Sequence, residues 1–335
     1  MKYKYSFIIP VYNRPDEIDE LLDSITKLEK HTEEIPFEVI IVEDGSTIPC
    51  NQIVDKYQNQ IDIKYFVKEN GGPSAARTFG IEKATGNYII LTDSDCILQS
   101  HHLLKINEIV TKNHLDAFGG ADTAHISFSK IQKAISYTMT SFLTTGGIRN
   151  KSKSMAGKKY YPKSYNLGFR KEIFNDIGGF PPIHPGEDTQ FSINLVEKGY
   201  NVEFIDNIEV FHKRRTTLKK YFKQVFLFGR TRIYLNFHYP QTAKIVFCLP
   251  TLFLLSSLFL ITSSFLCIYA IIPILLYAFL ILIDSSIKNK NIFIGFLSII
   301  TAFIQHYGYG SGYLIEFIWR NILKQKISKQ YMKEI

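Results

Sequence analysis

Hydrophobic residues follow two different patterns along the chain. In the first part, short apolar runs at residues 5–10, 37–42, 63–67 and 88–92 are rich in Ile, Val, Phe and Tyr, which is typical of buried strands. Between them, apolar residues at helical spacing predict helices, one after Pro15 and one at residues 73–84. Alternating strands and helices predict an α/β fold with a mainly parallel, Rossmann-like sheet.

The second pattern is a run of 39 residues, 245–283, without a charged side chain. One helical crossing of a membrane needs about 20 apolar residues. The run therefore predicts a transmembrane helical hairpin with legs at residues 245–261 and 265–283. A buried hairpin in a soluble core is the weaker alternative, because soluble helices usually keep a polar face.

A third apolar stretch, at residues 292–319, contains Gln305, His306 and Glu316. We favour a re-entrant or interfacial segment over a crossing, which would put the basic tail outside, against the charge rule. Gly308 and Gly312 permit close helix packing, although the Tyr- and Gly-rich run around them is equally able to break a helix.

Charge is distributed unevenly. The first 212 residues contain 23 Lys and Arg against 28 Asp and Glu, whereas the remainder contains 16 against 3. Basic residues flank the hairpin on both sides, so both ends should face the cytoplasm. Alternating cationic and apolar residues at 213–244 predict a helix on the anionic inner leaflet, with an ordinary amphipathic core helix as the alternative.

These patterns divide the chain into an α/β domain (1–212), a basic juxtamembrane region (213–244), the hairpin (245–283) and a third apolar segment with a basic tail (284–335). The apolar start of the chain is too short for a signal peptide, so we expect a cytosolic α/β domain on a multi-pass protein of the inner membrane. Membrane lipids are an expected partner and nucleic acid is not. Four scattered cysteines exclude a disulfide scaffold, and none is at CxxC spacing.

Polar clusters follow three of the predicted strands, where ligands collect in parallel sheets. They are Tyr12-Asn13-Arg14, Glu43-Asp44-Gly45-Ser46 and Asp93-Ser94-Asp95. The neighbouring carboxylates of Asp93 and Asp95 would repel each other. A divalent cation held by carboxylate and phosphate oxygens would offset that repulsion.

Two further motifs open helices. Asn70-Gly71-Gly72 precedes a helix whose N-terminus would offer N–H groups to an anion, with Arg77 adding a charge-assisted bond. A tight turn with a surface arginine is the alternative. Gly186-Glu187-Asp188 opens a helix at residues 189–198, where acids also occur simply to complement the helix dipole.

Taken in order, these motifs resemble the family 2 glycosyltransferases, which have the GT-A fold. The resemblance covers about residues 5–215. It implies a catalytic base at Asp188, with Glu187 beside it, and Mg²⁺ or Mn²⁺ held by Asp93 and Asp95. His212, after a predicted strand at residues 202–211, would be a further metal ligand. The implied nucleotide-sugar site comprises Pro10, Tyr12, Asn13, Glu43, Asp44, Gly71, Arg77 and Asp93, with Asp44 bonding the base.

The chemistry of sugar transfer fits these residue types. A metal neutralises the departing diphosphate, and a carboxylate deprotonates the attacking hydroxyl. One displacement inverts the anomeric centre, and no second nucleophile is evident. Processive synthases of the family carry Q-x-x-R-W, whereas Gln224 is followed by Val-Phe-Leu-Phe, so single sugar transfer is favoured. The alternatives are a processive synthase-like enzyme, an inactive membrane scaffold and, less favoured, a nucleotidyltransferase, which should have a glycine-rich loop after the first strand.

The acceptor is suggested by a local excess of positive charge. Residues 123–171 contain ten Lys and Arg and no Asp or Glu, in an otherwise acidic domain. Such a field suits a diphosphate. We therefore expect a lipid-diphosphate-linked glycan acceptor of surface polysaccharide biosynthesis, and we expect neutralisation of Lys158, Lys159 and Lys163 to raise the KM of acceptor or donor.

Overall fold

The computed structural model describes residues 3–29, 35–146, 159–181, 183 and 185–324. They form two compact units. The first contains the described residues up to Thr123 and from 159 to His212. The second contains residues 124–146 and 213–324.

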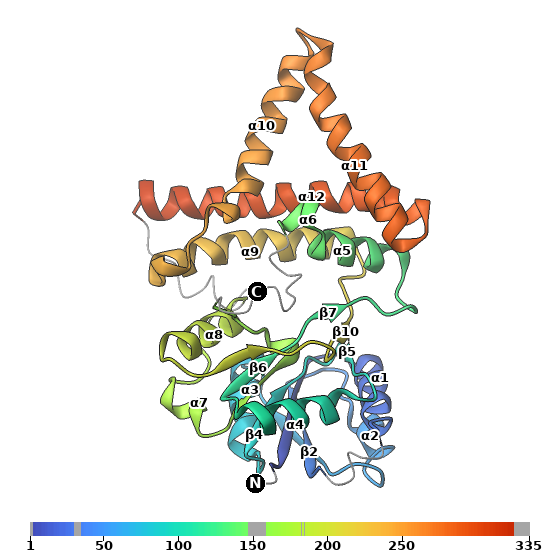
Figure 1. Ribbon diagram of the computed structural model, residues 1–335, viewed down its shortest axis with the longest axis vertical. Coiled ribbons are helices and arrows are strands. Elements are labelled where there is room, and N and C mark those ends of the chain that lie inside the picture. Colours follow the sequence, from blue (N-terminus) through green and yellow to red (C-terminus); the bar gives the residue numbers. More distant parts are fainter. Residues whose placement is uncertain (1–2, 30–34, 147–158, 182, 184, 325–335) are drawn as a thin grey trace. The chain divides into compact units, whose positions relative to one another are not determined.

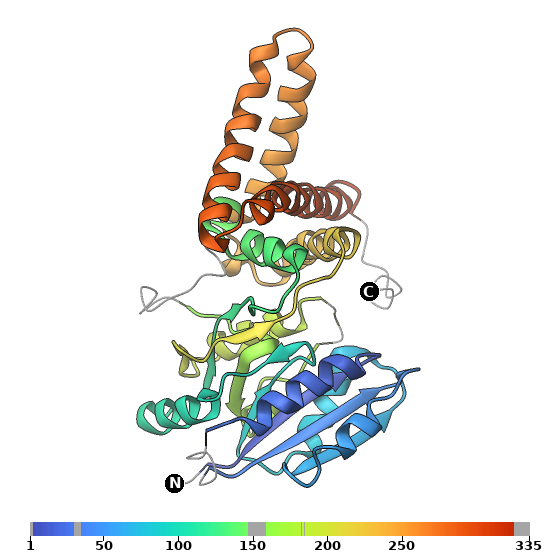
Figure 2. The same cartoon turned by 90° about the vertical axis from the view of Figure 1, so that its right-hand side faces the viewer.

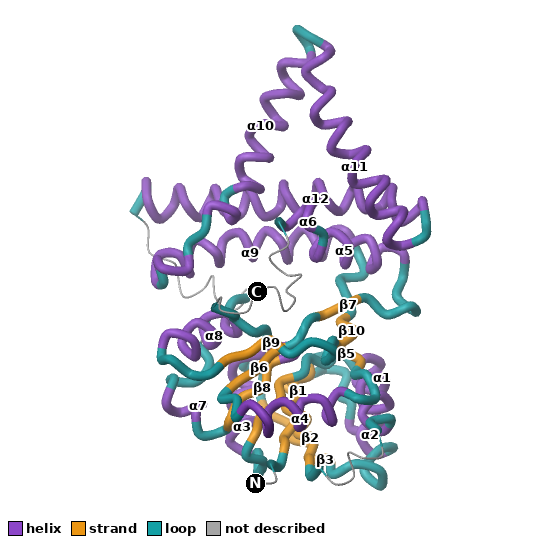
Figure 3. Tube along the Cα trace, in the orientation of Figure 1, coloured by secondary structure: helices purple, strands orange, loops and turns teal. Residues whose placement is uncertain are grey.

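The first unit is built on a seven-stranded sheet in the order β3-β2-β1-β4-β8-β6-β9 (Figures 1 and 3). Four strands run parallel: β1 (Tyr5–Val11), β2 (Phe37–Asp44), β3 (Ile63–Lys68) and β4 (Tyr88–Leu91). β8 (Leu167–Arg170) is antiparallel to β4 and to β6 (Ala117–Gly119), and β9 (Val202–Phe204) is parallel to β6. The predicted strands and the mainly parallel sheet are confirmed.

Helices cover both faces of this sheet (Figure 2). Phe7 and Ile9 pack with apolar residues of α1 (Pro15–Thr26), α2 (Asn51–Asp55) and α4 (His102–Asn113). Ile8 packs in a second cluster with α3 (Gly72–Lys83), α7 (Ile173–Asp176) and α8 (Glu187–Glu197). Successive side chains of a strand point to opposite faces, so the continuous apolar run of β1 serves two cores.

A small second sheet has the order β5-β10-β7, with β5 at Cys96–Ile97, β7 at Asp122–Thr123 and β10 at Val210–His212. The single strand predicted at residues 202–211 is wrong, because β9 and β10 belong to different sheets. Asn207 between them has φ 63°, a left-handed conformation that interrupts a strand. The interruption allows β10 to pair His212 with Cys96.

The second unit is helical. It comprises α5 (Lys130–Thr140), α6 (Phe142–Thr145), α9 (Leu218–His238), α10 (Leu249–Ser264), α11 (Ile272–Asn289) and α12 (Ile292–Phe317). Within it, α9 and α12 lie side by side, and α10 and α11 rise from them as a hairpin (Figures 1 and 2). The expected helical hairpin is therefore present.

Close packing of α9 on α12 depends on glycine. A Cβ atom at Gly312 would lie 2.0 Å from the carbonyl oxygen of Phe226, and one at Gly229 would lie 2.1 Å from that of Tyr309. The close approach predicted from Gly308 and Gly312 is confirmed. The alternative of a helix break is not observed, since α12 is continuous through these glycines.

Residues 124–146 were assigned by sequence to the N-terminal domain, but α5 and α6 pack within the second unit. The Thr138 and Thr301 hydroxyls of α5 and α12 are 2.7 Å apart, and Tyr137 donates a 2.7 Å hydrogen bond to Asp284 of α11. Ile135 and Met139 join Tyr221 and Val225 of α9 in one apolar cluster.

Among the described residues, two helical segments are long and apolar enough to cross a membrane: Ile268–Asn289 and Ile292–Ile322. The second includes a π-helical turn at Ile318–Ile322. The apolar helix Leu249–Ser264 is shorter than the usual span. Of the two predicted legs, the second (265–283) overlaps a candidate span, whereas the first (245–261) does not, because its helix α10 has only 16 residues.

Candidate active site

The loops after β1 and β2 are joined by Asn13. Its side-chain oxygen accepts hydrogen bonds from the backbone N–H groups of Thr47 (2.8 Å) and Ile48 (3.0 Å), and its own N–H donates to the Ser46 hydroxyl (2.7 Å). Asn13 has φ 54°, a conformation that asparagine tolerates better than most residues. Asn13 therefore shapes the loop beside Tyr12, whose side chain is exposed, while Pro10 lies within β1.

Glu43 and Asp44 are both buried, but they serve different neighbours. One Glu43 oxygen accepts bonds from the Cys50 backbone N–H (2.8 Å) and the Tyr65 hydroxyl (3.1 Å), within the β2 loop. The Asp44 oxygens accept bonds from the N–H groups of Gly71 (3.0 Å) and Gly72 (2.8 Å). The glycine-turn N–H groups expected to face an anion are therefore occupied by Asp44.

Arg77 connects three elements. Its guanidinium lies 2.8 Å from Asp93 after β4, 2.8 Å from Glu187 at the start of α8, and 3.1 Å from the Ser164 hydroxyl. Burial alone would lower the pKa of Arg77, but attraction by Asp93 and Glu187 outweighs it and raises the pKa. The sequence suggested a phosphate ligand or a surface arginine. Instead, Arg77 is only 4% exposed and pairs with two carboxylates of the protein.

Asp188 is the more accessible of the two acids that open α8, with 18% of its side chain exposed against 5% for Glu187. It accepts bonds from the Thr189 hydroxyl (3.1 Å) and the Ser164 N–H (3.4 Å), and Lys163 Nζ lies 3.9 Å away. Ser164 thus contacts both Asp188 and Arg77. A bonded chain of Asp188, Ser164, Arg77 and Asp93 connects α8 to the end of β4.

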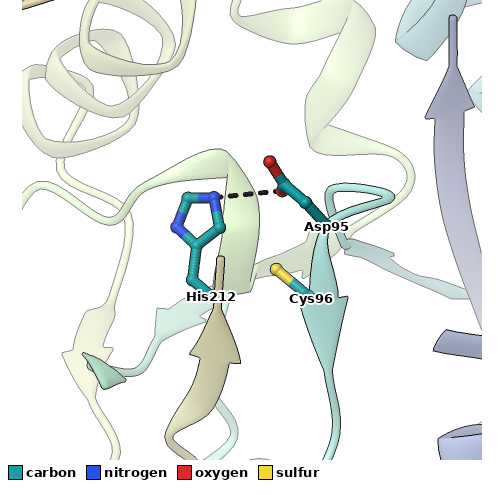
Figure 4. Close-up of side chains that lie close together, drawn as sticks. All are labelled: Asp95, Cys96 and His212. Atoms are coloured by element: carbon teal, nitrogen blue, oxygen red, sulfur yellow. Dashed lines mark ion pairs between the residues drawn. The ribbon is translucent and has the colours of Figure 1, made fainter. Parts of the chain in front are cut away.

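Asp95 lies between the guanidinium of Arg14 and the imidazole of His212. One oxygen is 2.6 Å from Arg14 Nη1 and the other is 3.1 Å from His212 Nε2 (Figure 4). Burial by itself would raise the pKa of Asp95, but His212 and Arg14 outweigh it and hold the pKa well below its ordinary value. Asp95 is therefore an anion that these neighbours stabilise.

Donor atoms of Asp95, Cys96 and His212 lie within 4.8 Å of one another, which makes them a possible metal site among the described residues. Burial raises the pKa of the Cys96 thiol well above its usual value. Mg²⁺ and Mn²⁺ prefer oxygen ligands to the soft sulfur of cysteine. A carboxylate oxygen and an imidazole nitrogen remain. This set fits a divalent cation that completes its coordination with diphosphate oxygens and water. Asp93 is tied to Arg77, so its place in the metal site stays a prediction.

Asp122 was missed by the sequence reasoning. Its carboxylate lies 3.5 Å from His212 Nδ1 and accepts a 3.2 Å hydrogen bond from the Tyr165 hydroxyl. The Tyr165 ring also packs against His212, with ring centroids 5.0 Å apart. The contact of Arg14 with Asp95 was missed as well. Asp122 stands outside any motif, and only the pairing of β7 with β10 brings it to His212.

Comparison with known proteins decides the family. The family model for "Glycosyl transferase family 2" matches residues 6–178, about half of the chain. The chain belongs to glycosyl transferase family 2. The resemblance read from the sequence motifs is thereby confirmed. The carboxylates of Glu43, Asp44, Asp93, Asp95 and Asp122 lie within the matched residues, whereas Glu187 and Asp188 at the start of α8 lie beyond them.

Among curated family 2 relatives, the poly(ribitol-phosphate) β-N-acetylglucosaminyltransferase TarS of Staphylococcus aureus is 35% identical over 115 residues. This match covers 34% of the present chain and 20% of TarS, so the chain spans only about a fifth of that relative.

Two solved structures share the GT-A-like fold. Residues 1–349 of TarS, in complex with UDP-GlcNAc, align with a TM-score of 0.51 and 18% identity over 95% of this chain and 92% of that one. The mannosyltransferase PcManGT of Pyrobaculum calidifontis, in complex with GDP-Man and Mn²⁺, aligns with a TM-score of 0.57 and 14% identity over 97% and 89%. At these identities, the likeness establishes the fold of this family 2 protein.

Proposed function

We propose that the chain is a membrane-anchored, metal-dependent, inverting glycosyltransferase that moves one sugar from a nucleotide-sugar donor to a glycan acceptor. The observation that carries the proposal is the network that joins Asp93, Arg77, Ser164 and Asp188 at the carboxyl end of the sheet. It connects the acids expected at the donor to the acid expected at the acceptor. The matched family model and the fold of the two structural neighbours support it.

Asp95 and His212 are the proposed metal ligands, and Tyr12, Pro10 and Asp44 the proposed walls of the nucleotide site. Bound Mg²⁺ or Mn²⁺ would act as a Lewis acid and stabilise the departing nucleoside diphosphate. His212 and Arg14 together hold the pKa of Asp95 below its ordinary value, so the carboxylate is ionised. Asp122 is a proposed positioning residue, because a carboxylate next to Nδ1 orients the Nε2 atom of His212 toward Asp95.

Asp188 is the proposed general base. It is more exposed than Glu187, and Ser164 and Thr189 bind it in a fixed orientation. Its carboxylate would take the proton of the attacking acceptor hydroxyl as the sugar bond forms with inversion. Glu187, paired with Arg77, would hold the start of α8 in place rather than take part in proton transfer.

A lipid-diphosphate-linked acceptor, and a place in surface polysaccharide biosynthesis at the inner membrane, remain the finer part of the proposal. They rest on the apolar hairpin and on the cations of residues 123–171. Of those cations, Lys163 lies beside Asp188, whereas Lys159 pairs with Glu197 at 2.7 Å. Arg149, Lys151, Lys153 and Lys158 lie outside the described residues.

The test is metal-dependent release of nucleoside diphosphate from a panel of UDP-, GDP- and dTDP-sugars. Asp188→Asn should lower kcat by about 10²–10⁴-fold, the usual contribution of general base catalysis. Asp16→Asn is the matched control, because Asp16 is likewise an acid in the first turn of a helix, α1. Release by no donor would favour an inactive scaffold, and repeated addition to one acceptor would favour a processive enzyme.

A further inference from the structure

The helical hairpin of the second unit has its polar and apolar residues reversed relative to a soluble protein. Buried positions of α10 include Thr251 and Ser257, and those of α11 include Ser285. Outward-facing positions are large and apolar, among them Leu258, Phe259, Leu275, Leu276 and Phe279. A soluble protein with this surface would expose a large continuous apolar patch.

The buried polar groups of these helices bond to one another. Thr251 donates to the Gly310 carbonyl (3.2 Å), Ser257 to the Tyr307 hydroxyl (3.1 Å), and Ser285 lies 2.7 Å from the Ser298 hydroxyl. Small polar residues between helices with apolar exteriors are typical of packing in lipid. The occupant that fits this exterior is therefore the hydrocarbon of a bilayer.

The polar side chains within the apolar sequence of α12 also face inward. Gln305 accepts a 2.6 Å bond from Tyr221, His306 lies 2.7 Å from the Tyr277 hydroxyl, and Glu316 is 2.7 Å from Arg230. Glu316 and Arg230 are both buried. These residues therefore leave the outer surface of α12 apolar.

The turn of the hairpin is apolar as well. Phe265 is 87% exposed and Leu266 is 95% exposed, and Ile268 and Tyr269 follow them as exposed side chains. The nearest charged residues in the sequence are Lys244 before the turn and Asp284 after it, at the opposite end of the hairpin. A turn that emerged into water on the far side would expose these apolar side chains at a considerable cost.

Three backbone N–H groups of the turn are satisfied within the turn itself. The N–H groups of Leu266 and Cys267 donate to the Ser263 carbonyl (3.0 and 2.9 Å), and that of Phe265 donates to the Thr262 carbonyl (3.3 Å). The hydroxyls of Thr262 and Ser264 donate to carbonyls of the preceding helical turn. A segment without water must satisfy its polar groups in this way.

The first leg of the hairpin is also short, although the second leg, Ile268–Asn289, is long enough to cross, and the turn can emerge only if both legs cross. At 1.5 Å per residue the 16 residues of α10 extend about 24 Å, whereas the hydrocarbon core of a bilayer is about 30 Å thick. We propose that the α10–α11 hairpin enters the membrane from one side and ends within it, with residues 265–269 in lipid. This rests on the membrane anchoring in the proposed function and replaces the expected multi-pass crossing by the hairpin with a one-sided anchor.

Cys267 in the turn provides the test. It is exposed, whereas Cys50 and Cys96 are buried, so Cys248→Ser leaves Cys267 as the reactive thiol. Sealed vesicles of both orientations, prepared from cells that produce the full chain, are treated with a membrane-impermeant maleimide. We expect Cys267 to react in neither orientation. After the vesicles dissolve in sodium dodecyl sulfate, which also exposes Cys50 and Cys96, labelling should exceed that of the Cys248→Ser, Cys267→Ser variant by one thiol.

A matched variant identifies the aqueous side of the first unit. Asn59→Cys, at an exposed position after α2, is combined with Cys248→Ser and Cys267→Ser, and should react in one vesicle orientation. Reaction of Cys267 in the other orientation would show a crossing and overturn the proposal. Reaction in the same orientation would show that the hairpin lies outside the membrane, which also overturns it.

Donor cleavage by the same vesicles separates this inference from the proposed function. Labelled Cys267 together with nucleoside diphosphate release would reject the one-sided anchor and leave the transferase activity intact. A protected Cys267 without release from any donor would retain the anchor and reject the proposed activity.

Discussion

The guanidinium of Arg77 lies 2.8 Å from the carboxylate of Glu187, a residue 110 positions further along the chain. Both groups are buried, and the same guanidinium also binds Asp93. The pair fixes the start of α8 to the end of β4. It thereby sets the position of Asp188, which follows Glu187 in the first turn of α8.

Arg77→Met should destabilise the protein by about 3–5 kcal/mol, because it leaves two buried carboxylates without their cation. Thermal unfolding followed by circular dichroism measures the loss. Arg77→Lys keeps the charge but not the planar guanidinium. The variant should therefore fold, and its kcat should fall by a larger factor than its KM rises. A stable Arg77→Lys variant with normal kcat would contradict a positioning role.

Asp122→Asn should weaken Mn²⁺ binding by about 10–100-fold, the usual effect of losing a carboxylate that orients a metal-binding histidine. Electron paramagnetic resonance of free Mn²⁺, in the absence of donor, measures this affinity without reference to turnover. Asp62→Asn, at an exposed acid, is the control. Asp122→Asn added to His212→Ala should produce no further loss if Asp122 acts through His212, and an additive loss would refute that route.

Glu38 should make stability depend on pH in the acid range. Burial alone would raise its pKa, but hydrogen bonds from Lys64, Ser6 and Thr85 outweigh it and lower the pKa to about 2 from 4.5. Because the folded pKa is the lower one, the stabilisation is fully present above about pH 4.5 and is lost as the pH falls toward 2. The difference in unfolding midpoint between the wild type and Glu38→Gln should shrink over that interval. A constant difference would argue against the shift.

Lys163 should matter to binding, and its neighbour Lys159 should not. Lys163 lies 3.9 Å from Asp188, so Lys163→Gln removes positive charge at the proposed acceptor position and should raise the KM of acceptor or donor. Lys159→Gln removes the same charge at an exposed pair with Glu197 and should leave kinetics nearly unchanged. Equal effects of the two changes would point to a diffuse field over the segment.

The fold could be predicted from sequence because its signals are local. Runs such as that of β1 are largely apolar on both faces, and Pro15 marks a helix start. Strand and helix positions therefore follow from neighbouring residues. Their order alone then favours a parallel sheet.

The site was only partly predictable because its polar side chains pair with residues that are distant in the sequence. Asp93, Asp95 and Asp188 stand in recognisable motifs, but nothing near Arg77 in the sequence indicates that Glu187 will neutralise it. Arg14 contacts Asp95, which lies 81 residues further along the chain, and Asp122 contacts His212, which lies 90 residues further. Both contacts depend on how the strands pair. The membership of α5 in the second unit also depends on distant partners such as Thr301.

Residues 124–146 give this protein an interleaved construction, in which the polypeptide leaves its α/β unit, supplies α5 and α6 to the helical one, returns, and leaves again after His212. A shortened form ending at His212 would keep α5 but lack α9 and α12. Ile135 and Met139 would then lose their packing against α9, and Thr138 its hydrogen bond to α12. The helical unit therefore cannot be removed as an independent piece. Any form of the chain without it would need a redesigned outer surface on α5.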